Sequence, residues 1–518
     1  MHDYTTEITY ISNYYGDLSP VHLVFIAAIN NVQPPDIFQS FTYCELGCGC
    51  GKTTNVIAAS YPHARCVGVD VNKDHIAIAR NESKGLNNIE FFDLSFTEAI
   101  EQDFPPFDFI TMHGVWSWVS DAVRSDILEF VKKFLKPNGL FYISYDAMPG
   151  WAQLLPFHKI MSVYTKDKAA TITEKAKAAM MYLQFLNENK SPLFEYSPYA
   201  RQFLQCLEKS DVRYIIHELF NKNLRPEYFC DVAEDMKKAN LFFVGDCVHI
   251  NNYQMMLSEP FRKLLNTTDD KVCMETHKSI MLNDRFRKDV YAKCESTPNS
   301  ASRNVKYFEK FLFGTLKPLS ELNLEVQIHG YTLTLNTDPY LKIFEILSSD
   351  QLTIWEINQK LGLPEERIYE TLENVINCML TNQFAIFFRK KNSAGQLQQI
   401  TFSSEYNSNQ IMNWEEQYSK YIFLASETAG DAFAISKQNA LIISAIYNLG
   451  FSKEAVVEYV YNYIIDGIKN GKNPFGFSEN HDIKYLISFN YEEVVRTLLK
   501  TLQSIGIISN VQSMEKAA

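Results

Sequence analysis

The sequence has no long hydrophobic run and no leader of the secretory type. None of its apolar stretches approaches the roughly 18 consecutive apolar residues that are typical of a membrane span. Its first residues lack the basic segment followed by an apolar one that marks a secretory signal. We therefore expect a cytoplasmic protein with no membrane span.

Positive charge is also scarce. Lys and Arg total 49 against 61 Asp and Glu, which gives a formal net charge of −12 at pH 7. A surface of this sign repels phosphate backbones unless a local basic patch overrides it. The charge balance therefore argues against nucleic acid as the partner.

Cysteine is sparse and irregularly spaced. The ten Cys residues suit reduced thiols better than a disulfide framework. Cys44, Cys48 and Cys50 cluster, but their spacing fits neither the paired cysteine knuckles of structural zinc nor a site with a nearby His pair. We interpret them as small residues of a glycine-rich turn and expect no metal.

Hydrophobic residues, in contrast, are plentiful. They make up 46% of the 518 residues, and aromatic residues make up 14%. This composition supports packed domains and argues against long disorder. At roughly 100 to 200 residues per domain, the length predicts two to four domains.

Short apolar runs alternate with helical patterns over residues 1–150, which is typical of βαβ units. The expected strands are 41–46, 64–70, 88–92, 107–112 and 139–145, and the expected helices are 52–60, 73–84 and 122–135. The turn Lys136-Pro137-Asn138-Gly139 precedes the last strand. We expect a doubly wound parallel sheet, which binds ligands at the carboxyl ends of its strands.

The pattern becomes mainly helical after Gly150. We expect a strand at 241–250, further helices to about residue 292, a polar linker at 296–302 and a hairpin at 322–336. Residues 340–387 follow the order helix, helix, turn, helix, strand, which resembles a winged-helix module. Its last helix, 364–380, is rich in Glu, so we expect it to be a scaffold or to face protein, not DNA.

The turn after the first expected strand carries the strongest local signal, Glu45-Leu46-Gly47-Cys48-Gly49-Cys50-Gly51. Alternating glycines let backbone approach a ligand closely. A dinucleotide fingerprint would need Gly at the position of Lys52, and a phosphate-binding P-loop would need Gly at the position of Leu46. An acidic residue followed by alternating glycines remains, and this block resembles the class I S-adenosylmethionine methyltransferases.

Asp70 ends the second expected strand, at the distance beyond the loop where a carboxylate can accept hydrogen bonds from ribose hydroxyls. Asp70 could also cap the next helix, but the glycine loop favours ribose binding. Asp93 ends the third strand, where the resemblance implies a position near the adenine amine, and helix capping stays open as its alternative. The resemblance implies S-adenosylmethionine as cofactor, S-adenosylhomocysteine as product, and cofactor contacts at Glu45, Gly47, Cys48, Gly49, Gly51, Asp70, Val71, Asp93, Leu94 and His113.

Two aromatic segments follow the fourth and fifth strands. They are Met112-His113-Gly114-Val115-Trp116-Ser117-Trp118-Val119 and Tyr145-Asp146-Ala147-Met148-Pro149-Gly150-Trp151. Both should lie at the edge of the sheet where the reactive end of the cofactor would be, although the Trp residues could instead only pack against helices.

These segments resemble bacterial methyltransferases with a C-terminal methyltransferase regulatory domain, including the rickettsial protein-lysine methyltransferases that modify outer-membrane protein B. Tyr14-Tyr15, Ser19-Pro20 and the segments 214–220, 226–229 and 240–245 agree with this family. The resemblance is specific over residues 1–255 and vague beyond about 300. It implies a homodimer and methylation of protein lysines in the bacterial cytoplasm. Asp146 stands where we expect the family to have Asn, which adds a charge near the pocket.

We therefore expect four parts. They are a helical lead-in (1–40), a Rossmann-like α/β S-adenosylmethionine-binding methyltransferase domain (41–165), a mainly helical middle with the regulatory domain (166–295) and a C-terminal region of winged-helix-like α+β modules (303–518).

A lysine amine must lose its proton before it can attack a methyl group, and its reference pKa is about 10.4. An aromatic wall would lower the local dielectric and also stabilise cations. We expect the residues that act on the acceptor to be His113, Trp116, Tyr145, Asp146 and Trp151, with His113 and Tyr145 positioning the amine and Asp146 as base or electrostatic anchor. Two alternatives stay open: a small-molecule methyltransferase, and a non-catalytic protein-binding platform that the cofactor only tunes.

Overall fold

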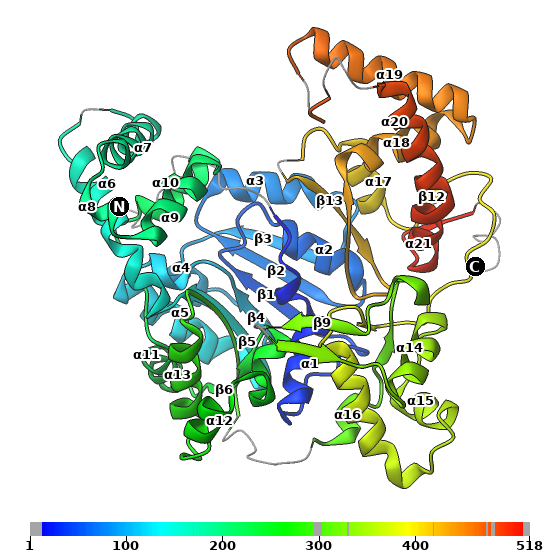
Figure 1. Ribbon diagram of the computed structural model, residues 1–518, viewed down its shortest axis with the longest axis horizontal. Helices are drawn as coiled ribbons and strands as arrows, with labels where there is room; N and C mark the ends of the chain where they lie inside the picture. Colours follow the sequence, from blue (N-terminus) through cyan, green and yellow to red (C-terminus); the bar gives the residue numbers. More distant parts are fainter. Residues whose placement is uncertain are drawn as a thin grey trace.

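The computed structural model describes residues 13–168, 170–294, 303–328, 331–417, 419–472, 475–477 and 482–510. A central sheet has the strand order β3-β2-β1-β4-β5-β7-β6 (Figure 1). β1 to β5 are parallel to one another, and β7 is antiparallel to both β5 and β6. The strands are β1 (Thr42–Leu46), β2 (Arg65–Asp70), β3 (Ile89–Asp93), β4 (Phe107–Met112), β5 (Leu135–Asp146), β6 (Phe242–Asp246) and β7 (Phe286–Ala292).

The predicted doubly wound α/β arrangement is confirmed for the first five strands. The helices packed with them are α2 (Lys52–Ser60), α3 (Lys73–Glu82), α4 (Phe96–Ile100) and α5 (Asp121–Phe134). β5 begins four residues before the expected strand, at Leu135, although Asn138 keeps the positive φ of 60° that a turn residue adopts. Apolar side chains on these strands, such as Cys44, Val67 and Ile110, form a buried core with α5.

The sheet is larger than the sequence predicted. The expected strand at 241–250 is present as the shorter β6. Residues 286–292, where we expected helix, form β7, which inserts between β5 and β6. The middle region therefore completes the sheet of the first domain, in addition to contributing the helices α6 (Leu155–Thr165), α7 (Ile172–Glu188), α8 (Pro192–Glu195), α9 (Pro198–Glu208), α10 (Val212–Leu219), α11 (Phe229–Lys238), α12 (Glu259–Leu265) and α13 (Lys271–Leu282).

The C-terminal region contains the predicted hairpin and the predicted order of helices. The expected linker at 296–302 lies outside the described residues. Figure 1 shows α6 to α10 on one side of the molecule and α17 to α21 on the other. The elements are β8 (Leu312–Gly314), β9 (Glu325–Ile328), β10 (Tyr331–Thr334), α14 (Tyr340–Ser349), α15 (Ile354–Lys360), α16 (Ile368–Met379), β11 (Ala385–Phe387), β12 (Thr401–Phe402), α17 (Glu405–Met412), β13 (Tyr421–Ser426), β14 (Asp431–Ser436), α18 (Lys437–Leu449), α19 (Lys453–Lys469), α20 (Ile483–Glu493), α21 (Leu499–Ser504) and β15 (Ile508–Ser509).

The acidic helix α16 packs within the chain. Arg303 bonds both to the carboxylate of Glu373 on α16 and to the backbone carbonyl of Ile29. Ile29 ends the lead-in helix α1 (Pro20–Ile29), which is buried along almost its whole length because the sheet and the C-terminal region both pack against it. In the described part of the chain, no helix combines the length and the hydrophobicity that crossing a lipid bilayer requires.

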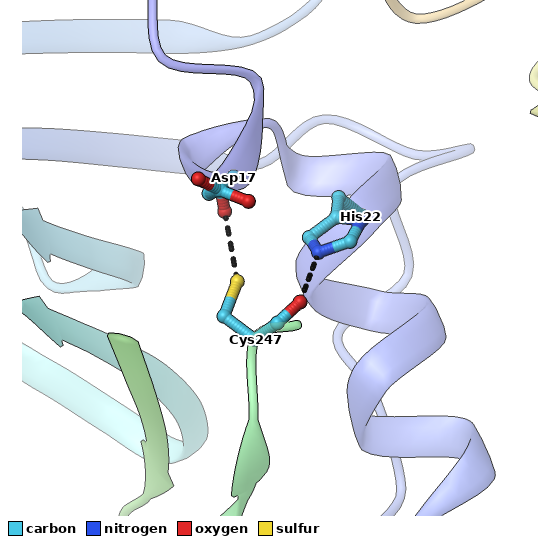
Figure 2. A group of neighbouring side chains, drawn as sticks. All are labelled: Asp17, His22 and Cys247. Carbon is cyan, nitrogen blue, oxygen red and sulfur yellow. Dashed lines mark hydrogen bonds between the residues drawn. The ribbon is translucent and has the colours of Figure 1, made fainter. Parts of the chain in front are cut away.

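A polar cluster joins the N-terminal segment to the end of β6. Figure 2 shows Asp17, His22 and Cys247, whose possible metal-ligand atoms lie within 4.8 Å of one another. The His22 ring donates to the Cys247 carbonyl at 2.7 Å, and the Cys247 thiol donates to the Asp17 carbonyl at 3.4 Å. The ammonium of Lys288 pairs with the Asp17 carboxylate. These contacts join the N-terminal segment to the end of β6. The positive charge beside Asp17 is that of Lys288, so the cluster is explained without a metal ion.

Candidate active site

The glycine-rich loop between β1 and α2 has the backbone that its sequence predicts. Gly47, Gly49 and Gly51 all have positive φ, at 70°, 54° and 72°. A Cβ atom added at Gly49 would meet nothing within 4 Å, whereas one added at Gly47 would lie 2.5 Å from Val115. Gly49 therefore presents bare backbone to open space, which is what close approach of a ligand requires.

Asp70 lies beside this loop at the end of β2. One carboxylate oxygen accepts the Gly49 N–H at 2.9 Å, and the other accepts the Asn72 N–H at 2.8 Å. The ring of His75, which the sequence analysis did not single out, lies 3.5 Å from the second oxygen. These contacts fix the carboxylate, and each oxygen keeps a lone pair for a further hydrogen bond.

A cavity of about 570 Å³ opens at this edge of the sheet. It brings together most of the residues expected to bind the cofactor: Glu45, Gly47, Cys48, Gly49, Asp70, Val71, Leu94 and His113. Asp146 and Trp151, both expected to act on the acceptor, also line it. The cavity therefore joins the loop after β1 to the segments after β4 and β5.

Two helices of the middle region close another part of the cavity. Phe203 on α9 and Tyr214 and Glu218 on α10 line it, and we call the group Asp146, Trp151, Phe203, Tyr214 and Glu218 the acceptor side. None of these three helix residues is predicted from the sequence as a site residue. The available signal was that Tyr214 and Glu218 are four residues apart and share one helix face, opposite the apolar residues that pack into the core.

Burial controls the charges in the cavity. Burial lowers the pKa of His113 to about 4, so its ring is neutral at pH 7. The ring stacks on Tyr15, with centroids 4.0 Å apart, and its Nδ1 lies 2.8 Å from the Tyr142 hydroxyl. Burial raises the pKa of Glu45 to about 8, despite the hydrogen bond from Thr54. Burial therefore allows acids in the cavity to be neutral near pH 7.

Burial also raises the pKa of both acids on the acceptor side. The pKa of Asp146 rises to about 7, although a hydrogen bond from Trp151 and the charge of Arg285 oppose the rise. The pKa of Glu218 is raised by burial and by the nearby Asp146. A bound cation would favour the ionised form of both carboxyls.

Comparison with protein families identifies two segments of the chain. A methyltransferase domain matches residues 44–141, and a predicted methyltransferase regulatory domain matches residues 211–293. The chain is an S-adenosylmethionine-dependent methyltransferase with a regulatory domain. The residues present fit this cofactor, because a cradle without Cβ atoms and a fixed carboxylate lie side by side in the lining of a ligand-sized cavity.

The methyltransferase has relatives over most of its length. An uncharacterized protein of Synechocystis sp. is 29% identical over 452 residues, which are 85% of this chain and 87% of the relative. An uncharacterized protein of Rickettsia prowazekii is 28% identical and covers 76% of this chain and 75% of its own. The structure of PKMT2 from Rickettsia typhi in complex with AdoHcy has a TM-score of 0.70 at 20% identity, and covers 96% of this chain and 99% of its own. The last comparison shows that the whole fold is shared.

Two residues expected at the acceptor lie outside the cavity of the methyltransferase. Trp116 is fully buried, and its indole donates to Glu227 at 2.9 Å, while Trp118 lines the cavity in its place. Tyr145 is also fully buried and donates to Asp289 at 2.6 Å. Side chains alternate along a strand, so Tyr145 points to the opposite face from Asp146.

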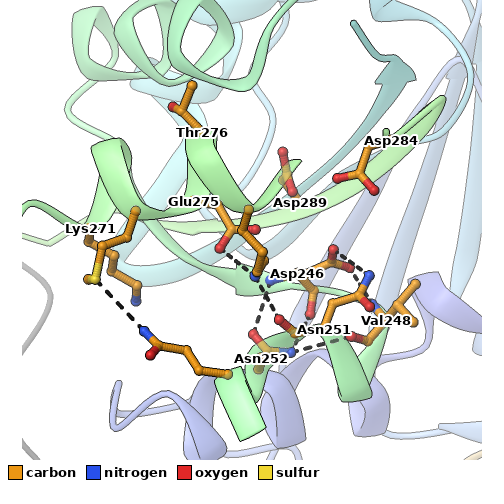
Figure 3. A network of polar contacts seen from close by, with 12 residues as sticks. Asp246, Val248, Asn251, Asn252, Lys271, Glu275, Thr276, Asp284 and Asp289 are labelled. Atoms are coloured by element: carbon orange, nitrogen blue, oxygen red, sulfur yellow. Dashed lines mark hydrogen bonds and ion pairs between the residues drawn. The ribbon is translucent and has the colours of Figure 1, made fainter. Parts of the chain in front are cut away.

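The partner of Tyr145 belongs to a buried ionic network between β6, β7 and α13. Figure 3 shows Asp246, Glu275 and Asp289 on these neighbouring elements. The guanidinium of Arg287 bonds to Asp289 at 2.7 Å and to Glu275 at 2.8 Å. Tyr145 therefore stabilises the sheet, and the structure gives it no access to an acceptor.

Two residues expected to bind the cofactor are also not among those that line the cavity. A Cβ atom added at Gly51 would lie 2.6 Å from Ala79 and 2.7 Å from Phe91, so this glycine allows α2 to pack against α3 and β3. Asp93 lies 3.5 Å from Arg80 at the surface, and the next residue, Leu94, faces the cavity instead.

Gly51 and Gly49 have different surroundings, so replacement by Ala should have different effects at the two positions. Gly51→Ala should lower the free energy of unfolding by at least about 2 kcal/mol, because a left-handed residue becomes strained and its methyl group overpacks. Gly49→Ala should lower it by only about 1 kcal/mol, and should weaken S-adenosylhomocysteine binding roughly tenfold by placing a methyl group in the cradle. Urea unfolding and calorimetry measure both quantities. Equal losses of stability in the two variants would contradict this division of roles.

Proposed function

We propose that this methyltransferase transfers methyl groups to lysine side chains of a protein substrate, of the kind represented by outer-membrane protein B. The observation that carries the proposal is the chemistry of the acceptor side, where two carboxyls and three aromatic rings line one cavity with the glycine loop. Acids attract an ammonium group, and aromatic faces stabilise cations. The fold shared with PKMT2 from Rickettsia typhi supports the same class of substrate.

Different residues of the chain would bind the cofactor and the acceptor. S-adenosylmethionine supplies, when bound, an electrophilic methyl group on a sulfonium. Asp70 would accept hydrogen bonds from the ribose hydroxyls, and the Gly49 backbone would lie against the cofactor. Trp151, Phe203 and Tyr214 would exclude water from the acceptor and hold it in place, and orientation of the amine would lower the barrier.

A small-molecule acceptor is the second candidate, because about 570 Å³ is the size of a small-ligand site. The two acids argue against an anionic metabolite, since a carboxylate acceptor would be repelled by Asp146 and Glu218 once they are ionised. A cationic or neutral metabolite would still fit this cavity.

Transfer of a labelled methyl group distinguishes these functions. The protein is incubated with isotopically labelled S-adenosylmethionine and a bacterial cytoplasmic extract, and every labelled species is identified by mass spectrometry. Our proposal predicts label on lysine residues of polypeptides. Label only in the small-molecule fraction would support the second candidate, and cofactor binding without any transfer would support a non-catalytic platform.

We also propose the remaining features that the family resemblance implies. The protein would be a homodimer, which sedimentation would detect as twice the mass of one chain, and it would act in the cytoplasm before its substrate is exported. We retain the four parts at 1–40, 41–165, 166–295 and 303–518, except that β6 and β7 extend the sheet of the second part.

A further inference from the structure

We propose that Glu218, which the regulatory domain contributes through α10, forms with Asp146 a two-carboxylate site that captures the acceptor ammonium, and that Asp146 then accepts its proton. The inference rests on the proposed lysine methylation and adds a specific role for the regulatory domain. In this arrangement the methyltransferase domain alone has half of the acceptor site.

The position of Asp146 supports this role most directly. The residue is 4% exposed and lines the cavity, and its Oδ2 atom is buried without a hydrogen-bond partner in the part of the chain that the structure describes. Its backbone is held firmly, because its N–H donates to Ser117 at 2.8 Å and its carbonyl accepts from Glu227 at 3.1 Å. Buried polar atoms normally have a hydrogen-bond partner. A buried carboxylate oxygen without one therefore indicates where a hydrogen-bond donor of a ligand would bind.

Glu218 approaches the same space from the helical side. It lines the cavity on the helix face it shares with Tyr214 and lies close enough to Asp146 for their charges to interact. The opposite face of α10 is fixed in the core by Ile215, Ile216 and Leu219. The helix therefore holds the Glu218 carboxyl over the cavity and not in solvent.

The charged and titratable neighbours allow a cation to bind between the two carboxyls. Tyr15 and Tyr214 lie near Glu218, and Arg285, which also lines the cavity, lies near Asp146. Arg285 donates to the Tyr199 hydroxyl at 3.1 Å and is itself exposed. Burial favours the neutral form of both acids while the site is empty of cations, and an entering ammonium would cause them to release protons.

The proton transfer completes the reaction without a further reagent. An N–H proton of the bound ammonium moves to the Asp146 carboxylate, and the freed lone pair forms the new N–C bond to the methyl group. The C–S bond breaks with its electron pair remaining on sulfur. The products are a methylated ammonium, a neutral thioether and a protonated Asp146, which returns its proton to solvent.

Calorimetry with a defined peptide tests this site apart from activity. Acetyl-Ala-Lys-Ala-amide is titrated into the full chain saturated with S-adenosylhomocysteine at pH 7, in two buffers of different ionisation enthalpy. The wild type should release protons when it binds the peptide, because the entering ammonium favours the ionised form of both acids. Glu218→Gln and Asp146→Asn should each weaken binding about tenfold or more and reduce the proton release, because each removes one charge-assisted contact.

Three controls separate the possible failures. Glu234→Gln, an exposed acid on α11, should change nothing, and the same peptide with acetyl-lysine should bind all variants equally. Affinity for S-adenosylhomocysteine should stay within about twofold in both acid variants, which also shows that they are folded. Wild-type lysine binding that both variants retain would overturn this inference alone. A wild type that binds S-adenosylhomocysteine but no lysine peptide would overturn the lysine acceptor as well.

Discussion

Asp70→Asn is expected to weaken S-adenosylhomocysteine binding by about 100-fold, which corresponds to about 2.7 kcal/mol. The carboxylate is held by the N–H groups of Gly49 and Asn72, so its oxygens are already oriented for ribose hydroxyls. Asparagine keeps the size of the side chain, but it loses the charge and replaces one acceptor with a donor. Calorimetric titration measures the effect directly.

Asp74 on α3 provides the matched control for this substitution. It is exposed and lies four residues away, so Asp74→Asn should leave the affinity unchanged. Asp70→Ala should abolish methyl transfer, and the expected fold would persist because the sheet core does not depend on this side chain. If Asp70→Asn bound S-adenosylhomocysteine as tightly as the wild type, the ribose contact would be wrong.

Arg287→Met is expected to lower the free energy of unfolding by about 3 to 5 kcal/mol. The guanidinium is buried and bonds to Asp284, Glu275 and Asp289. Methionine fills similar space but leaves Glu275 and Asp289 with no compensating guanidinium in a buried region, which is costly. The midpoint of urea unfolding, followed by tryptophan fluorescence, measures the loss.

The exposed Arg367 is the control for Arg287. Its pair with Glu370 on α16 lies at the surface, so Arg367→Met should change stability by at most about 1 kcal/mol. If both variants lost a similar free energy of unfolding, burial would not determine how much the Arg287 network contributes to stability.

The first five strands could be predicted from the sequence because their apolar residues are contiguous and turns separate them. β7 could not be predicted in the same way. Its first half carries Arg287-Lys288-Asp289, a run of charge that is typical of a surface. Arg287 and Asp289 are buried because they neutralise each other, and only the folded chain reveals that pairing.

The two parts of the candidate site also differ in how far the sequence predicts them. The part of the cavity beside the glycine loop depends on a local loop and on strand ends, so the sequence predicts that Gly49, Asp70 and Val71 lie there. The acceptor side depends on how α9 and α10 pack over the sheet, so the sequence alone does not predict that Glu218 lines the cavity. The two-residue period of β5 already predicts that Tyr145 lies on the opposite face of the sheet from Asp146.

The most direct test of the account is a crystal structure with S-adenosylhomocysteine and a lysine-containing peptide bound together. We predict that the ribose hydroxyls contact Asp70, that the adenosyl group lies against Gly49, and that the lysine nitrogen lies between the sulfur atom and the carboxyls of Asp146 and Glu218. A nucleoside bound away from the glycine loop, or a lysine that does not enter the cavity, would contradict the account.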